Sequence, residues 1–298
     1  MSAAPKILDE RLPMTLPRLA EKKHLGEPIV MVTAYDHPSA QVAEEAGVDM
    51  VLVGDSAANV VLGYDSTVPI TVDELLMLSR AVRRGLTTPF MVCDLPFGSY
   101  EASDEQAVTT AQRFVKEAGA DAVKLEGGGV MVDRAQAIVA AGIPVMGHVG
   151  LTPQTSTALG GYKAQGRTAD AALRVAQDAL ALEDAGCFSI VFEAIPAAVA
   201  EELTERLYIP VIGIGAGSST AGQVLVFHDL LGIYDGHAPR FAKRYASLKA
   251  DMVDAVGRYA DEVRGGTFPA PEHTYSIDPG ELADFREQWV ARERIRRP

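Results

Sequence analysis

Short apolar runs rich in β-branched residues alternate along the chain with segments whose apolar positions follow helical spacing. The first run is PIVMVTAY at 28–35, and HPSAQVAEEAG then follows with helical spacing up to Gly47. These runs lack polar alternation, which is typical of parallel strands covered on both faces. The pattern predicts strands at 28–35, 50–55, 89–95, 121–126, 144–149, 188–194 and 210–215, and an eighth at 223–233.

The segments between these runs predict helices. Their approximate ranges are 72–84, 104–118, 132–141, 168–185 and 197–206. Glycines end helices before several strands, as in AGVDMVLVGDS and AGADAVKLEGG. Eight alternating units favour a closed (β/α)₈ TIM barrel of the α/β class over an open doubly wound sheet. No GxGxxG motif follows the first strand, which also argues against the open sheet.

We expect a single domain spanning 1–298, in which both ends of the chain extend a barrel core. Residues 1–26 are expected to form a helix that caps the bottom of the barrel, and the core is expected to cover about 24–275. Glycine and proline in RGGTFPAPEHTYSIDPG break the order before a charged helical segment. The tail at 276–298 is therefore expected to be a helical extension that docks on the barrel surface or on a neighbouring subunit.

Composition narrows the classes of partner. The chain has 298 residues, 48% of them hydrophobic, and a formal charge of -13, which argues against nucleic acid or an anionic membrane as a partner. Cys93 and Cys187 lie beside or within apolar stretches and read as core residues of a protein in a reducing compartment. No signal peptide or apolar run of membrane-spanning length is found, so we expect a cytoplasmic protein.

An ionisable side chain stands at the end of each of five apolar runs. They are Asp55 in VLVGDS, Asp94 in FMVCDLP, Glu126 in AVKLEGG, His148 in VMGHVG and Glu193 in IVFEAIP. In a parallel barrel these positions converge on one mouth. One such residue commonly caps a loop or helix, but several carboxylates together repel one another unless a cation neutralises them. Oxygen ligands suit Mg²⁺, with Mn²⁺ or Co²⁺ as substitutes.

The roles of three residues near these strand ends stay open on the sequence alone. Lys124 lies two residues before Glu126 and so faces the same side of its strand, where it can be a counter-ion, a ligand for substrate oxygens or, least favoured, a Schiff-base lysine. Ser56 can bind a substrate carboxylate or cap the next segment. His148 can be functional or a satisfied core histidine.

Two glycine-rich segments follow the fifth and seventh strands. The first, 150–167, is a long polar loop of the kind that closes over a site. The second, GIGAGSST at 213–220, is compatible with a phosphate-binding loop or with close backbone packing.

Beyond these individual features, the sequence closely resembles the ketopantoate hydroxymethyltransferase family over about residues 24–275. The matching stretches, in order, are TAYD, VGDS, GYDST, AVRRG, DLPFGSY, VKLEGG, GHVGLTPQ, GGYKAQGR, PVIGIGAG and HDLLG. So many matches in one order are more specific than any single motif. The family often has Cys-Val-Pro after the glutamate of its FE motif, where this chain has Ala194, Ile195 and Pro196.

The resemblance implies a barrel enzyme that transfers a hydroxymethyl group from 5,10-methylenetetrahydrofolate to 3-methyl-2-oxobutanoate. It implies that Asp55 and Asp94 bind Mg²⁺ and that Glu126 reaches the ion directly or through water. Ser56 and Lys124 would hold the keto acid, and Glu193 would accept its proton. The family also implies a homo-oligomer, commonly a decamer, in which the 276–298 tail could tie subunits together.

Two rival readings belong to other classes. One is a barrel of the phosphoenolpyruvate mutase and isocitrate lyase group. This group shares the fold and the dependence on a metal ion, but it typically carries a cysteine in an active-site loop. The other is a non-catalytic barrel scaffold, for which loss of Glu193 or of the aspartates would be the sign. Those residues are all present.

Overall fold

The computed structural model describes residues 11–234 and 239–296. The chain forms two compact units, which join between Ala246 and Ser247. We expected one domain over 1–298 with the tail starting at 276, so the division comes earlier in the chain than expected. In the described part of the chain, no helix is both long and apolar enough to cross a membrane.

The first unit is a closed barrel of eight parallel strands in sequence order. The barrel closes where β1 pairs with β8, with Ile29 opposite Gly222. The strands are β1 (Ile29–Thr33), β2 (Met50–Val53), β3 (Phe90–Asp94), β4 (Ala122–Lys124), β5 (Val145–Gly150), β6 (Ser189–Glu193), β7 (Val211–Ile214) and β8 (Gly222–Leu225). This confirms the (β/α)₈ fold.

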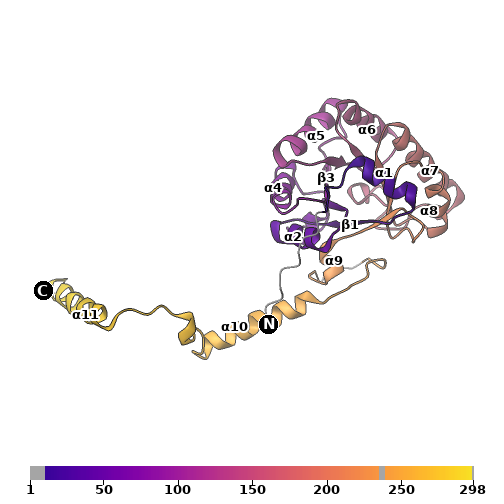
Figure 1. Ribbon diagram of the computed structural model, residues 1–298. Helices are drawn as coiled ribbons and strands as arrows, with labels where there is room; N and C mark the ends of the chain where they lie inside the picture. Colours follow the sequence, from indigo (N-terminus) through magenta and orange to yellow (C-terminus); the bar gives the residue numbers. More distant parts are fainter. Residues whose placement is uncertain (1–10, 235–238, 297–298) are drawn as a thin grey trace. The chain divides into compact units, whose positions relative to one another are not determined.

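Helices surround the strands, as Figure 1 shows for α4 to α8. Those of the first unit are α1 (Leu16–Leu25), α2 (His37–Ala46), α3 (Ala57–Val60), α4 (Val72–Arg83), α5 (Asp104–Ala118), α6 (Val130–Ala140), the 3₁₀ helix η1 (Pro153–Thr155), α7 (Ala169–Asp184), α8 (Ala197–Thr204) and α9 (Phe227–Leu231). Local capping explains several ends. The Asp36 side chain accepts a hydrogen bond from the Ser39 amide at the start of α2, and Gly47 ends that helix at φ 76°.

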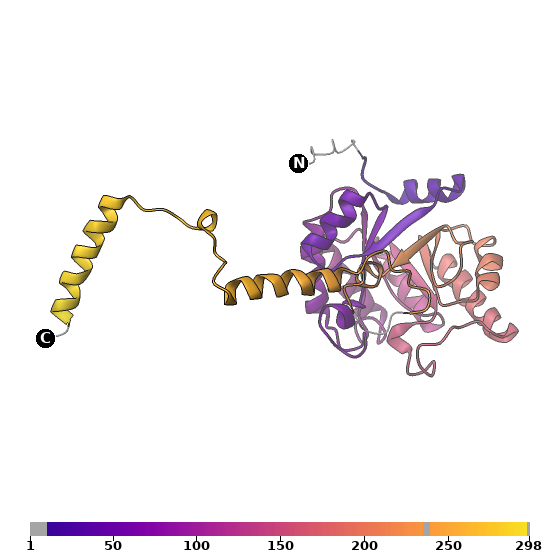
Figure 2. The same ribbon diagram turned by 90° about the horizontal axis from the view of Figure 1, so that it is seen from below.

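Helix α1 closes the N-terminal end of the barrel, as expected for the part of 1–26 that is described; residues 1–10 lie outside the described residues. Its Leu19 is 1% exposed and belongs to the same apolar cluster as Ile29, Met50 and Phe90 inside the barrel. Lys23 Nζ also donates to Ile209 O at 2.7 Å. In Figure 2, α1 is the indigo helix that lies across one end of the strands.

The eighth strand is shorter than the expected range of 223–233. Strand β8 ends at Leu225, and Phe227–Leu231 form α9, with Gly232 as its C-cap at φ 64°. The prediction was wrong for this second half because Phe227, Leu230 and Leu231 have helical spacing within a continuous apolar run. An eleven-residue strand would also exceed the usual strand length of about 5–6 residues.

The second unit begins at Ser247. It contains α10 (Leu248–Arg264), the 3₁₀ helix η2 (Pro271–His273) and α11 (Pro279–Arg296). The expected helical segment of the tail is α11. Helix α10 has no buried residue, although it carries Met252, Val256, Tyr259 and Val263 at helical spacing.

Candidate functional site

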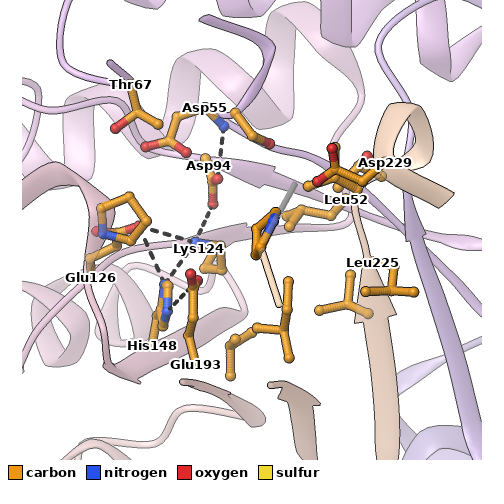
Figure 3. A pocket seen from close by; sticks show the side chains of 18 of the residues that line it. Leu52, Asp55, Thr67, Asp94, Lys124, Glu126, His148, Glu193, Leu225 and Asp229 are labelled. Atoms are coloured by element: carbon orange, nitrogen blue, oxygen red, sulfur yellow. Dashed lines mark hydrogen bonds and ion pairs between the residues drawn. The ribbon is translucent and has the colours of Figure 1, made fainter. Parts of the chain in front are cut away.

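One pocket at the C-terminal ends of the strands contains every site residue expected from the sequence. Asp55 and Ser56 follow β2, Asp94 ends β3, and Glu193 ends β6. The other lining residues among those expected are Lys124 at the end of β4, Glu126 two residues beyond it, and His148 in β5. Figure 3 shows the side chains of Asp94, Lys124, Glu126, His148 and Glu193 directed toward one another. The barrel thus brings together residues that are up to 138 positions apart (193 − 55) in the sequence.

Asp55 and Asp94 are neighbours in space. The Asp55 amide donates to Asp94 Oδ2 at 2.9 Å, and both side chains are buried. Gly54 permits this approach, because a Cβ there would lie 2.9 Å from Ser56 Oγ and 3.4 Å from Asp94 Oδ2. The glycine before the aspartate in VGDS therefore serves close packing at the strand end.

Lys124 is the central cation of the pocket. Its Nζ lies 2.8 Å from Asp94 Oδ1 and 3.8 Å from Glu126 Oε1, with 4% of the residue exposed. Burial alone would lower the pKa of Lys124, but Asp94, Glu126 and Asp55 raise it above its ordinary value. The amine therefore stays protonated, which favours a role in binding anionic oxygens over a Schiff base.

The carboxylates differ in their electrostatic state. Burial, followed by the charges of Asp94 and Glu126, raises the pKa of Asp55 well above its ordinary value. Burial also raises the pKa of Asp94, although Lys124 opposes the shift. Burial acts the same way on Glu126, but His148 and Lys124 outweigh it and lower the pKa. Negative charge is thus least compensated around Asp55.

His148 lies between two glutamates. Its Nδ1 is 3.3 Å from Glu126 Oε1, and its Nε2 is 3.3 Å from Glu193 Oε2. Burial and Lys124 lower the pKa of His148, but the two glutamates raise it to about 9. A protonated imidazole can donate to both carboxylates, so the histidine can link Glu126 to Glu193.

The donor set fits a hard divalent cation that is only partly held by protein. In the described part of the chain, no three His, Cys, Asp or Glu side chains form a ready-made metal cluster. Mg²⁺ is usually held by one or two carboxylates and completes its shell with water and substrate oxygens. The raised pKa of Asp55 shows that a cation beside Asp55 and Asp94 would relieve repulsion. Asp55, Asp94 and Glu126 therefore fit such an ion.

Gln154 is a residue of this site that the sequence interpretation missed. It lies in η1 and is 4% exposed. Its backbone N–H donates to Glu126 Oε2 at 3.0 Å, and its side-chain Nε2 donates to Asp55 Oδ2 at 3.0 Å. The Tyr100 hydroxyl donates to Gln154 Oε1 at 2.6 Å. The glutamine of GHVGLTPQ thus joins the loop after β5 to two carboxylates, and its place directly after Pro153 in a matching stretch was the available signal.

Ser56 has a protein partner as well as a place in the pocket. Its Oγ lies 2.8 Å from the Tyr35 hydroxyl, which comes from the segment after β1. The serine hydroxyl keeps the capacity for a further hydrogen bond to a bound oxygen. Tyr35 is 1% exposed, so it fixes the serine from behind.

The two glycine-rich loops behave differently. Pro153 of the 150–167 loop lines the pocket, and Gln154 anchors the start of that loop beneath it. In the 213–220 loop, a Cβ on Gly215 would meet Phe241 at 2.5 Å, and one on Gly217 would meet Ala197 at 2.6 Å. Both glycines have positive φ. Close backbone packing therefore explains the glycines of this second loop.

The two cysteines are core residues, as expected. Both thiols are free and buried, and burial raises the pKa of each to about 12. Neither is among the residues that line the pocket. The pocket therefore has no thiol that could act as an acid or nucleophile.

Comparison with known proteins agrees with the geometry of this site. The sequence model of the family described as ketopantoate hydroxymethyltransferase matches residues 13–271. The 3-methyl-2-oxobutanoate hydroxymethyltransferase of Heliobacterium modesticaldum is 52% identical over 89% of this chain and 96% of its own length. The enzyme of the same name from Moorella thermoacetica is 53% identical over 89% of this chain and 99% of its own.

Solved structures extend the likeness to the fold alone. A phosphonopyruvate hydrolase in complex with oxalate and Mg²⁺ has a TM-score of 0.57 and 14% identity, covering 95% of this chain and 99% of that one. A phosphoenolpyruvate phosphomutase from Streptomyces platensis subsp. rosaceus has a TM-score of 0.54 and 15% identity, covering 93% and 98%. The level of sequence identity to the named relatives, over most of each chain, is decisive: this chain belongs to the ketopantoate hydroxymethyltransferase family.

Proposed function

We propose that this protein transfers a hydroxymethyl group from 5,10-methylenetetrahydrofolate to 3-methyl-2-oxobutanoate. With one water consumed, the products are 2-dehydropantoate and tetrahydrofolate, the first step of pantothenate biosynthesis. The observation that carries the proposal is the pocket itself, where a protonated lysine and three carboxylates lie beside Glu193 in a chain of this family. A keto acid needs such a site, because it brings two kinds of oxygen and an acidic C–H bond.

The binding of the keto acid follows from the charges. Lys124, at the end of β4, supplies an ammonium group for the anionic oxygens, and the Ser56 hydroxyl, beyond the end of β2, supplies a neutral donor. Asp55, Asp94 and Glu126 would hold Mg²⁺, with Mn²⁺ or Co²⁺ as substitutes. The ion, when bound, draws electron density from the keto acid and so lowers the barrier to loss of its C3 proton.

Proton removal is assigned to Glu193. Its carboxylate lines the pocket from β6, on a different strand from the proposed metal ligands. His148 Nε2 contacts Glu193 Oε2 at 3.3 Å, so the histidine orients the base and keeps its negative charge paired. Lys124 can then stabilise the negative charge that develops on the keto oxygen as the C3 proton leaves. The resulting nucleophilic carbon bonds to the one-carbon unit of the folate. Water then replaces the folate nitrogen on that unit, which supplies the hydroxyl group of 2-dehydropantoate and releases tetrahydrofolate.

The rival barrel chemistry of the phosphoenolpyruvate mutase group has less support. The phosphoenolpyruvate phosphomutase structure has only 15% sequence identity to this chain, so the likeness concerns the fold alone. Cys93 and Cys187 are both buried away from the pocket. A non-catalytic scaffold would have no reason to keep a buried lysine among acids, because such groups are costly to desolvate.

Location and assembly are part of the same proposal. Two free thiols suit a reducing compartment, so we assign the protein to the cytoplasm. We also assign it to a homo-oligomer, on the pattern of its family, and α10 supports this with apolar side chains along one face. Light scattering on a chain lacking 276–298 tests the tail: an unchanged mass would contradict its role in assembly.

Product formation tests the proposed function. Purified protein, Mg²⁺, 3-methyl-2-oxobutanoate and 5,10-methylenetetrahydrofolate are mixed, and 2-dehydropantoate is followed by mass spectrometry. We expect product in the wild type and its loss when a chelator removes the metal. A wild-type protein that forms no product with any of the three metal ions would contradict the proposal.

A further inference from the structure

Asp229 is an ionisable residue of the pocket that has no role in the chemistry above. It lies on α9 and is 8% exposed, yet its carboxylate has no hydrogen-bond or ion-pair partner within residues 11–234 and 239–296. Burial raises the pKa of Asp229, and the charge of Arg244 offsets this only in part. A buried carboxylate without a partner is costly, so it marks a place where a ligand can supply donors.

The surroundings of Asp229 differ from those of the catalytic residues. Around the barrel, β2 to β6 supply the charged arc from Asp55 to Glu193. The rest of the circle, from β7 through β8 to β1, and the segment that follows α9 supply mainly apolar lining: Ile214, Val224, Leu225, Val226, Pro239 and Phe241. Figure 3 shows Asp229 and Leu225 across the pocket from Glu126 and His148. The pocket therefore has one half suited to an anion and another suited to a flat apolar group with one polar edge.

A rigid wall supports the apolar half. A Cβ on Gly215 would lie 2.5 Å from Phe241 Cδ1, so the aromatic ring packs directly on the backbone after β7. Thr33 accepts a hydrogen bond from the Phe227 amide at 2.9 Å, which ties the start of α9 to the end of β1. Both contacts hold the wall and the carboxylate in fixed positions on the same half of the pocket.

The chemistry of a reduced folate matches this half. The pyrimidine ring of its pterin carries a 2-amino group beside a ring N–H, two donors that point the same way. A carboxylate can accept from both at once, which gives strong and directional hydrogen bonds. The pyrimidine half of the ring system is planar, so its face can lie against an apolar wall while its amino edge meets the carboxylate.

We propose that Asp229 binds the 2-amino and ring N–H groups of the pterin of the one-carbon donor, with the ring lying against Leu225 and Phe241. This inference rests on the proposed function, because it identifies the half of the pocket that takes the second substrate. Glu193 on β6 then stands at the border between the keto-acid half and the folate half. Asp229 acts as a binding residue for the donor and takes no part in proton transfer.

A binding comparison tests the pairing of atoms. Calorimetry measures the affinity of wild type and Asp229→Asn for tetrahydrofolate and for an analogue with hydrogen in place of the 2-amino group. We expect the wild type to prefer tetrahydrofolate by about tenfold or more, as for a hydrogen bond to a charged group. In Asp229→Asn the preference is expected to fall below about threefold. An unchanged preference in the variant would overturn the inference.

Kinetics separate the inference from the proposed function. In Asp229→Asn we expect the KM for 5,10-methylenetetrahydrofolate to rise about tenfold or more, while deuterium exchange into the keto acid without folate stays within about twofold of wild type. Asp65→Asn, which removes a carboxylate from an exposed residue outside the pocket lining, is the matched control and is expected to change neither. An unaltered KM in a folded Asp229→Asn would contradict the inference alone, whereas a wild type that makes no product would remove both proposals.

A second variant covers the case in which Asp229→Asn does not fold. Leu225→Trp enlarges a half-buried side chain on the apolar wall. We expect it to block tetrahydrofolate binding and to preserve deuterium exchange, because the keto-acid half is untouched. Retained tetrahydrofolate affinity would contradict the assignment of this half to the folate.

Discussion

The two ends of the barrel interior are built from opposite kinds of side chain. At the N-terminal end, Leu19 of α1 packs with Ile29, Met50 and Phe90 in an apolar cluster. At the C-terminal end, Lys124 lies among buried carboxylates, with His148 beside it. The same eight strands pass through both layers, so the difference comes from which residues end each strand and not from the fold.

The difference separates stability from chemistry. Burying apolar side chains stabilises the fold, whereas burying several charges costs free energy that their mutual attraction only partly offsets. The raised pKa of Asp55 shows this cost, since burial and neighbouring acids both oppose its ionisation. Changes at the C-terminal end are therefore expected to lower activity more than stability, and changes at the N-terminal end to do the reverse.

Asp55→Asn gives the largest expected effect. The variant keeps an oxygen that can accept from Gln154 Nε2 but loses a proposed metal ligand, so we expect activity to fall by about a thousandfold. Metal affinity, measured by calorimetry with Mg²⁺, is expected to fall with it. Activity within tenfold of wild type would contradict the role of Asp55.

The same variant also makes a prediction about pH. A carboxylate whose pKa is raised on folding destabilises the folded state as pH rises above its unfolded value, which is 3.8 for aspartate. Without metal, Asp55→Asn is therefore expected to be at least as stable as wild type at pH 7, and this advantage is expected to vanish below pH 3.8. Chemical denaturation in chelator at several pH values measures it, and a variant clearly less stable at pH 7 would contradict the electrostatic account.

Leu19→Ala tests the opposite end. The side chain is 1% exposed, so its truncation is expected to lower the free energy of unfolding by about 2–4 kcal/mol. Because Leu19 is remote from the pocket, kcat is expected to stay within about a factor of two. Leu180→Ala, on a half-exposed position of α7, is the matched control with a smaller loss of stability. A loss of activity at full stability would contradict the division between the two ends.

Gln154→Leu gives the smallest of these effects. It removes the side-chain hydrogen bonds to Asp55, to Tyr100 and to the Leu95 carbonyl, but keeps the backbone bond to Glu126. We therefore expect metal affinity and kcat/KM to fall by about tenfold. Gln136→Leu, the same change at an exposed position of α6, is expected to leave both unchanged. If added Mg²⁺ does not restore part of the lost activity, the glutamine does not act by positioning a metal ligand.

The sequence predicted the strands and the charged arc because both follow a strict local rule. Each apolar run ends at one level of the barrel, so Asp55, Asp94 and Glu193 could be placed together without coordinates. The same rule could not predict Gln154 and Asp229 as site residues. They come from η1 and α9, whose positions depend on tertiary packing. Nor could it predict the two-unit division at Ala246, since helical periodicity indicates an apolar face but not what covers it.

The most direct test of the account is deuterium exchange at C3 of 3-methyl-2-oxobutanoate, followed by NMR in heavy water with Mg²⁺ and without folate. We predict exchange in the wild type and a loss of about a hundredfold or more in Glu193→Gln, because the carboxylate that accepts the proton is gone. Exchange at the wild-type rate in a folded Glu193→Gln would contradict the claim that this end of the barrel uses Glu193 as its base.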